Sequence, residues 1–224
     1  NCTELWNAGS LMAQRIIIHA NHKGSVTIPA TSAKGEIDNV TGGSSLAELE
    51  TAVKQMDQII VNYKKLADGK ELKFTNHGNA GRNGKYLGYD KPNTRAAAVA
   101  SSGDDVIWTL KVQENGSFKL YNFVHNVYLG VPADPTPVIT TEKDAPAFDF
   151  IVTDNDKAAL VTTGGKMVHV ANHSNFKLIQ YYSISDGASL WTIAQDGNIV
   201  VTREQYDAAA AAKEALPNAI QQAY

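Results

Sequence analysis

Short apolar runs separated by turns of Gly, Asn and Asp fill the middle of the chain, residues 70–196. Apolar and polar residues alternate within these runs, and alternation with a period of two is typical of strands that bury one face. Three patterns recur at nearly constant spacing: an opening strand (72–76, 118–122 and 158–162), a turn leading into a strand (84–88, 126–130 and 165–169) and an aromatic closing strand (107–110, 147–150 and 190–193). A further strand is centred on Val99, Ile139 and Ile179.

This repeat predicts the fold class. Each unit of about 40 residues offers four short strands, so three units give twelve strands. Three copies of a four-strand unit fit an all-β trefoil, because three blades are too few to close a propeller. Six strands would form a short barrel, and six would form hairpins that cap one end. Two core layers are expected, one of Leu87, Leu129 and Val168 and one of Trp108, Phe148 and Trp191.

Both ends of the chain carry helical patterns. Residues 1–69 predict a helical N-terminal segment with a long loop at 19–43, and residues 197–224 predict an Ala-rich C-terminal helix that packs on it. The clearest helix begins at a capping box formed by Ser45 and Glu48. It carries a heptad seam of Leu46, Leu49, Val53, Met56, Ile60 and Tyr63. The seam predicts either a helical hairpin or bundle within the chain or an intermolecular coiled coil.

Composition narrows the classes of function. With 43% apolar residues the chain can bury a core, which excludes disorder of the whole chain. The 20 basic and 23 acidic residues give a net charge of −3 without a basic run, which argues against a nucleic-acid ligand. No apolar run approaches the roughly 20 residues of a membrane span. Cys2 is the single cysteine, so no disulfide can form within the chain. The chain begins at Asn1 without Met, which indicates trimming, and we expect it to be secreted or at the cell surface.

The sequence contains no recognisable constellation for catalysis, a cofactor or a metal. It has no Gly-x-Ser-x-Gly elbow, no phosphate loop and no GxGxxG before a helix, and the Gly-rich run at 78–84 predicts a hairpin loop. His19 with His22, and His169 with His173, are pairs without a third ligand at a familiar spacing. We therefore expect a chain that is not an enzyme and that binds no cofactor and no metal.

The middle region resembles the ricin-type β-trefoil lectin-like superfamily over about 127 of the 224 residues. The resemblance rests on the threefold period, on the turn Gly-Lys-Tyr-Leu-Gly at 84–88 and on the aromatic closing strand of each repeat. It implies a non-catalytic, carbohydrate-binding module of an exported multidomain protein, with a glycan or polysaccharide as its ligand. The Gln that the family carries two residues before the closing Trp is replaced here by Val106, Pro146 and Ser189.

A sugar site needs an aromatic face for the apolar side of the ring and a few fixed polar groups for its hydroxyls. The first two repeats supply both, and we predict carbohydrate contacts from Asn76, Tyr86, Tyr89, Asp90, Asn122, His125, Tyr128 and Asp134. The third repeat has fewer aromatic residues until Tyr181 and Tyr182. Residues that recur in both repeats have a structural alternative, which is packing for Tyr86 and Tyr128 and turn hydrogen bonding for Asn76 and Asn122.

A second hypothesis is a protein-interaction or structural module. In that case the heptad helix and the C-terminal helix would form the working surface, for other domains of the same polypeptide or for a protein partner, and the trefoil would be a scaffold. The surroundings of Tyr89, Asp90 and Asp134 discriminate between the two hypotheses. Clustering of these side chains in a concavity favours sugar, whereas scattering beside an uncovered heptad seam favours a protein partner.

Overall fold

The computed structural model describes residues 65–153 and 155–200, together with six isolated positions between 51 and 62. The heptad seam, the loop at 19–43 and the Ala-rich C-terminal helix lie outside these residues. The flanking helical segments and the domain boundaries therefore stay predictions.

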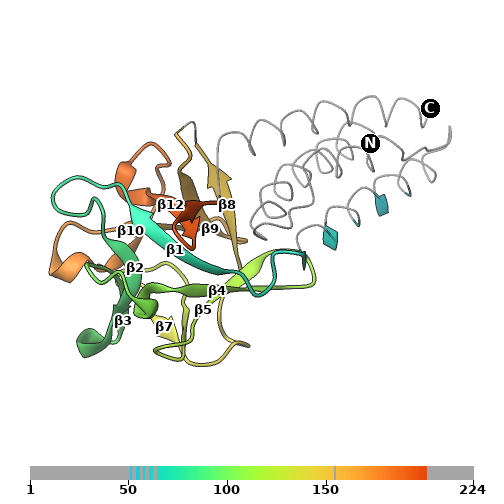
Figure 1. Cartoon of the computed structure of the whole chain (residues 1–224), viewed down its shortest axis with the longest axis horizontal. Coiled ribbons are helices and arrows are strands. Elements are labelled where there is room, and N and C mark those ends of the chain that lie inside the picture. The colour runs from blue at the N-terminus through green and yellow to red at the C-terminus, as the bar shows by residue number, and fades with distance from the viewer. Residues whose placement is uncertain are drawn as a thin grey trace. The chain divides into compact units, whose positions relative to one another are not determined.

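Six strands close into a barrel (Figure 1). Along the chain, each of them pairs antiparallel with the next, and the last pairs back with the first. This closure leaves the barrel without a free edge. The six strands are β1 (Glu71–Asn76), β4 (Trp108–Val112), β5 (Phe118–Asn122), β8 (Phe148–Val152), β9 (Ala158–Thr162) and β12 (Leu190–Gln195).

The other six predicted strands form three hairpins, one in each repeat. They are β2 (Tyr86–Asp90) with β3 (Arg95–Val99), β6 (Val127–Leu129) with β7 (Val138–Ile139), and β10 (Met167–Val170) with β11 (Leu178–Tyr181). All twelve predicted strands are present, so the all-β trefoil prediction is confirmed. A short additional strand, β13 (Asn198–Ile199), pairs with β12. The 3-10 turns are η2 (Lys91–Asn93), η3 (Asp104–Val106), η4 (Ser174–Phe176) and η5 (Gly187–Ser189).

The alternation along the strands determines which side chains enter the core. In β5, for example, Phe118 and Leu120 are buried while Lys119 and Tyr121 face outward at half exposure. Burial of the apolar set removes a large area from water and supplies most of the favourable free energy of folding. The prediction that these residues are buried in the core is confirmed, because all six members of the two predicted layers have zero exposed surface: Leu87, Leu129, Val168, Trp108, Phe148 and Trp191.

The three hairpins are joined to one another through backbone hydrogen bonds. The amide of Ala96 in the first repeat donates to the carbonyl of Thr136 in the second, at 3.0 Å. The amide of Thr136 then donates to the carbonyl of Leu178 in the third, at 2.8 Å. Segments that lie about 40 residues apart in the sequence thus form one continuous cap, and a backbone shift in one hairpin is felt by the other two.

Candidate functional site

Two of the predicted contact residues, Asn76 and Asn122, lie inside the protein. Both are fully buried at equivalent places at the end of an opening strand. The amide of Asn76 donates to the carbonyl of Ala188 at 3.0 Å, and its oxygen accepts from the amide of Gly78 at 2.9 Å. Asn122 donates to the carbonyl of Asp105 at 2.7 Å and accepts from the amide of His125 at 3.1 Å. These bonds satisfy buried backbone groups, so both residues hold turns in place.

The first-repeat residues are brought into contact with different partners. Asp90 forms an ion pair with Arg95 at 3.2 Å and accepts a hydrogen bond from the amide of Asn93 at 2.8 Å.

Tyr89 makes an edge contact with His125, with ring centroids 5.1 Å apart, and this is the one aromatic contact between two predicted site residues. Tyr86 is half-buried opposite Val99 of the same hairpin.

Asp134 forms an ion pair with a residue of another repeat. Its carboxylate pairs with Lys177 of the third repeat at 2.5 Å, and its side chain is 65% exposed. Tyr89, Asp90 and Asp134 thus each have a different partner. The predicted residues therefore lie in several environments.

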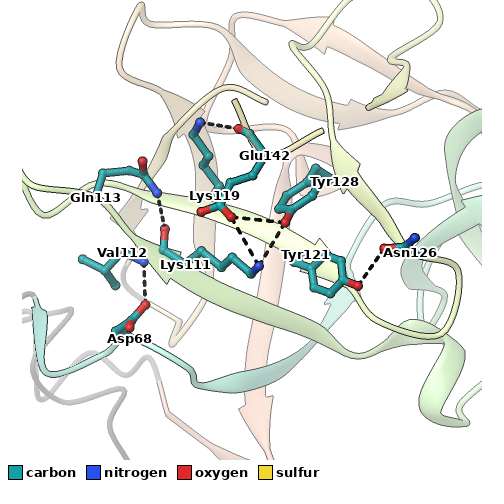
Figure 2. A network of polar contacts seen from close by, with 9 residues as sticks. All are labelled: Asp68, Lys111, Val112, Gln113, Lys119, Tyr121, Asn126, Tyr128 and Glu142. Carbon is teal, nitrogen blue, oxygen red and sulfur yellow. Dashed lines mark hydrogen bonds and ion pairs between the residues drawn. The ribbon is translucent and has the colours of Figure 1, made fainter. Parts of the chain in front are cut away.

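Tyr128 belongs to a polar and aromatic network that joins the first and second repeats, shown in Figure 2. Its hydroxyl accepts a hydrogen bond from the Lys111 ammonium group at 2.9 Å. Lys111 also reaches the Glu142 carboxylate at 3.4 Å and lies over the rings of Tyr121 and Tyr128, at 4.5 and 5.3 Å from their centroids. The hydrogen bond to Tyr128 raises the pKa of Lys111, with a further contribution from Glu142, so the ammonium group stays charged.

The third repeat contains a stack of aromatic side chains that repeat symmetry alone does not indicate. The imidazole of His169 lies against the ring of Tyr181, with centroids 4.1 Å apart and planes 26° apart. Tyr181 in turn stacks on Tyr182 at 4.8 Å and 17°. His169 is 5% exposed, and its Nδ1 lies 2.8 Å from the hydroxyl of Ser189. Tyr182, at the outer end, is 89% exposed. We call these three residues the aromatic stack.

The position of His169 explains why only one repeat has this stack. The equivalent residues in the first two repeats are Gly88 and Gly130. A β-carbon at Gly88 would lie 2.5 Å from a methyl carbon of Val99, and one at Gly130 would lie 2.5 Å from the carbonyl oxygen of Pro137. The first two repeats therefore have no room for a side chain here. Comparing the three copies for a residue that only one of them carries would have singled out His169.

Burial lowers the pKa of His169 and of His77 below the ordinary value of 6.5. The unfolded chain therefore binds more protons than the folded chain as the pH falls through this range. The stability contributed by the two neutral imidazoles is fully present above pH 6.5 and is lost as the pH falls toward the lower folded pKa values.

We expect the urea midpoint of unfolding to decrease between pH 7.5 and pH 5.5 (about the range in which histidine titrates). A variant with both His77→Gln and His169→Gln should show a flatter dependence in the same window. A dependence identical in the native chain and the variant would contradict this assignment.

Neither a metal centre nor a membrane helix emerges from the described residues. They contain no group of three or more His, Cys, Asp or Glu side chains placed to hold a metal ion. In the same part of the chain, no helix has the length and apolar character needed to cross a bilayer.

Comparison with known proteins gives similarity at the level of structure. No family model matches the chain, and no curated protein matches it. A solved mosquitocidal holotoxin is similar over 59% of this chain and 17% of its own, with a TM-score of 0.50 and 10% identity. The ricin B-like lectin of Macrolepiota procera, solved with lactose, is 15% identical over 57% of this chain and 96% of its own, with a TM-score of 0.44. A designed threefold-symmetric protein, ThreeFoil, is 20% identical over 56% and 98% of the two chains, with a TM-score of 0.44.

At these identities, similarity bears on the fold alone. The strand register described above establishes the β-trefoil architecture, and the holotoxin is similar in fold at a TM-score of 0.50. The resemblance to a ricin-type β-trefoil domain is thus confirmed as a likeness of fold. Because one fold can carry many functions, the function has to be argued from the side chains of this chain.

Proposed function

We propose that this chain is a non-catalytic, lectin-like module that binds carbohydrate through the aromatic stack of its third repeat. The observation that carries the proposal is Tyr182, a residue that is 89% exposed and whose ring lies nearly parallel to that of Tyr181. An exposed aromatic side chain is usually free to rotate, whereas this one rests on a column that ends at buried His169. A ring ordered before binding loses less conformational entropy when the ligand arrives.

The chemistry of the stack suits a pyranose. The C–H face of a sugar ring is apolar and covers a flat aromatic face, while its hydroxyls need nearby hydrogen-bonding groups. Ser183 and Ser185 follow directly in the chain, with their hydroxyl oxygens 2.8 Å apart. Ser183 is next to Tyr182 in the sequence, and its hydroxyl is proposed as such a group. The stack carries no net charge, since burial lowers the pKa of His169, and it therefore suits a neutral sugar.

The wider setting belongs to the same proposal. An exported multidomain protein, secretion or display at the cell surface, and helical flanks at residues 1–69 and 197–224 are proposed on the sequence alone. Tyr89 with His125 is proposed as a second contact region, because each was predicted as a carbohydrate contact and their rings lie 5.1 Å apart.

A glycan array probed with the native chain and with Tyr182→Ala tests the proposal. We expect the native chain to bind a neutral glycan and the variant to lose about tenfold or more in affinity, which corresponds to about 1.4 kcal/mol of lost ring contact. Tyr182→Phe keeps the ring and should bind within a few-fold of the native chain. The high exposure of Tyr182 means that neither substitution should lower the melting temperature.

A Tyr89→Ala variant on the same array separates the two contact regions. Loss of binding in Tyr89→Ala with retention in Tyr182→Ala would place the site at the first repeat instead. Absence of binding to every glycan by the native chain would overturn the carbohydrate function.

A further inference from the structure

The polar network around Tyr128 contains two lysines directly opposite each other. Lys111 of β4 and Lys119 of β5 are partners in the strand register and point to the same outer face of the barrel. Like charges directly opposite on a strand pair repel each other. The carboxylate of Glu142, in the loop before β8, reaches Lys111 of this pair.

The carboxylate of Glu142 makes long contacts with its neighbours. Its carboxylate lies 3.4 Å from the ammonium nitrogen of Lys111 and 3.4 Å from the hydroxyl of Tyr128, at the long end of the hydrogen-bond range. Its side chain is 48% exposed. Lys119 contacts the backbone carbonyl of Glu142 and not its carboxylate. An ion pair this exposed contributes little to stability, so an external carboxylate can compete with it.

An aromatic side chain and an exposed amide adjoin this point. Tyr121 is half-buried and extends from Lys111 toward Asn126, as Figure 2 shows. Its hydroxyl donates to the side-chain oxygen of Asn126 at 2.8 Å, and Asn126 is exposed. A ligand whose carboxylate replaces that of Glu142 would have an aromatic ring and an amide beside it.

We infer that this face of β4 and β5 is a binding site for a carboxylate-bearing saccharide, such as a uronic acid, whose carboxylate displaces Glu142 from Lys111 and Tyr128. The inference rests on the proposed function in taking the ligand to be a saccharide, but it concerns a different face and a different charge. The carboxylate of Glu142 thereby competes with the ligand for Lys111. The aromatic stack of the third repeat binds neutral sugar, and the site around Lys111 binds acidic sugar.

Titration of the native chain with sodium glucuronate, followed in proton–nitrogen correlation spectra, tests the inference, with glucose as the neutral control. Glucuronate should shift the amide signals of β4 and β5 around Lys111, and glucose should not. Glu142→Gln removes the competing charge and should tighten glucuronate binding about fivefold. Lys111→Met removes the charge that holds the ligand and should weaken binding about tenfold or more.

Glu142→Gln should raise the affinity for glucuronate and Lys111→Met should lower it, and these opposite effects indicate a ligand site. In a purely structural network, both substitutions would weaken the network. No binding of glucuronate to Glu142→Gln, or equal binding of glucose and glucuronate at this face, would overturn the inference. Tyr182→Ala should leave glucuronate binding unchanged, and Lys111→Met should leave neutral-glycan binding unchanged. Failure of the proposed function at the aromatic stack is therefore seen separately from failure at this site.

Discussion

Replacing Trp108 with Phe should destabilise the trefoil by about 1–3 kcal/mol more than the same replacement at Trp191. The two residues close the first and third repeats, and both have zero exposed surface. They differ in one contact. The indole N–H of Trp108 donates to the carbonyl of Leu87 at 2.9 Å, whereas that of Trp191 has no hydrogen-bond partner in the described part of the chain.

The loss of ring volume is nearly the same at the two positions, so it cancels in the comparison. At Trp108 the substitution also takes a donor away from a buried carbonyl, and an unsatisfied buried group is costly. At Trp191 it removes a buried N–H that is itself unpaired, which offsets part of the cavity cost. Truncating either residue to Ala would cost about 3–5 kcal/mol and would hide the difference.

Urea unfolding followed by far-UV circular dichroism gives the two free energies of unfolding. The second repeat provides a natural control, because Phe148 fills the equivalent position with zero exposed surface. A Phe ring is thus compatible with the layer. Equal destabilisation of the two variants would mean that the bond from Trp108 to Leu87 contributes nothing measurable.

The fold was predictable because the residues that build it carry their own signal. Trp108, Phe148 and Trp191 recur at nearly equal spacing, and in a strand a shift by one residue would turn them to the solvent. Periodicity and repeat length together define twelve strands, and the pairing of those strands into a barrel and three hairpins then follows from short antiparallel connections.

The side chains that could bind a ligand carried a weaker signal. Lys111 and Glu142 are 31 residues apart and meet because a loop folds over two strands, which no periodicity encodes. Asn76 and Asn122 were predicted as contacts with turn hydrogen bonding as the structural alternative, and in the structure both amides bond to turn backbone. His169 ends the third copy of the turn pattern, where the first two copies have Gly. A residue that departs from the repeat in this way can create a surface that the other copies lack.

Replacing Gly130 with Ala should cost about 3 kcal/mol or more, near the upper end for overpacking a core. The added β-carbon would lie 2.5 Å from the carbonyl oxygen of Pro137, which accepts the hydrogen bond of the Gly130 amide at 2.9 Å. A backbone carbonyl cannot rotate away without moving its strand. The neighbouring residue, Thr136, connects the hairpins of all three repeats, so the strain would spread through the cap.

Gly88→Ala is the matched control, because the same position in the first repeat meets a side chain and not a backbone. Its β-carbon would lie 2.5 Å from a methyl carbon of Val99, and a side chain can move more cheaply than a strand. Gly88→Ala should therefore be destabilising but less so than Gly130→Ala, as measured by urea midpoints. The reverse order, or a Gly130→Ala variant as stable as the native chain, would contradict this account.

The third copy of this position completes the argument. His169 stands where the other repeats require Gly, so His169→Gly should be tolerated by the backbone and should act on the aromatic stack instead. Without the imidazole, Tyr181 loses the ring that it rests on, and the order of Tyr182 is lost with it. The first two repeats use this position for close packing of the cap, and the third uses it to support an exposed aromatic surface.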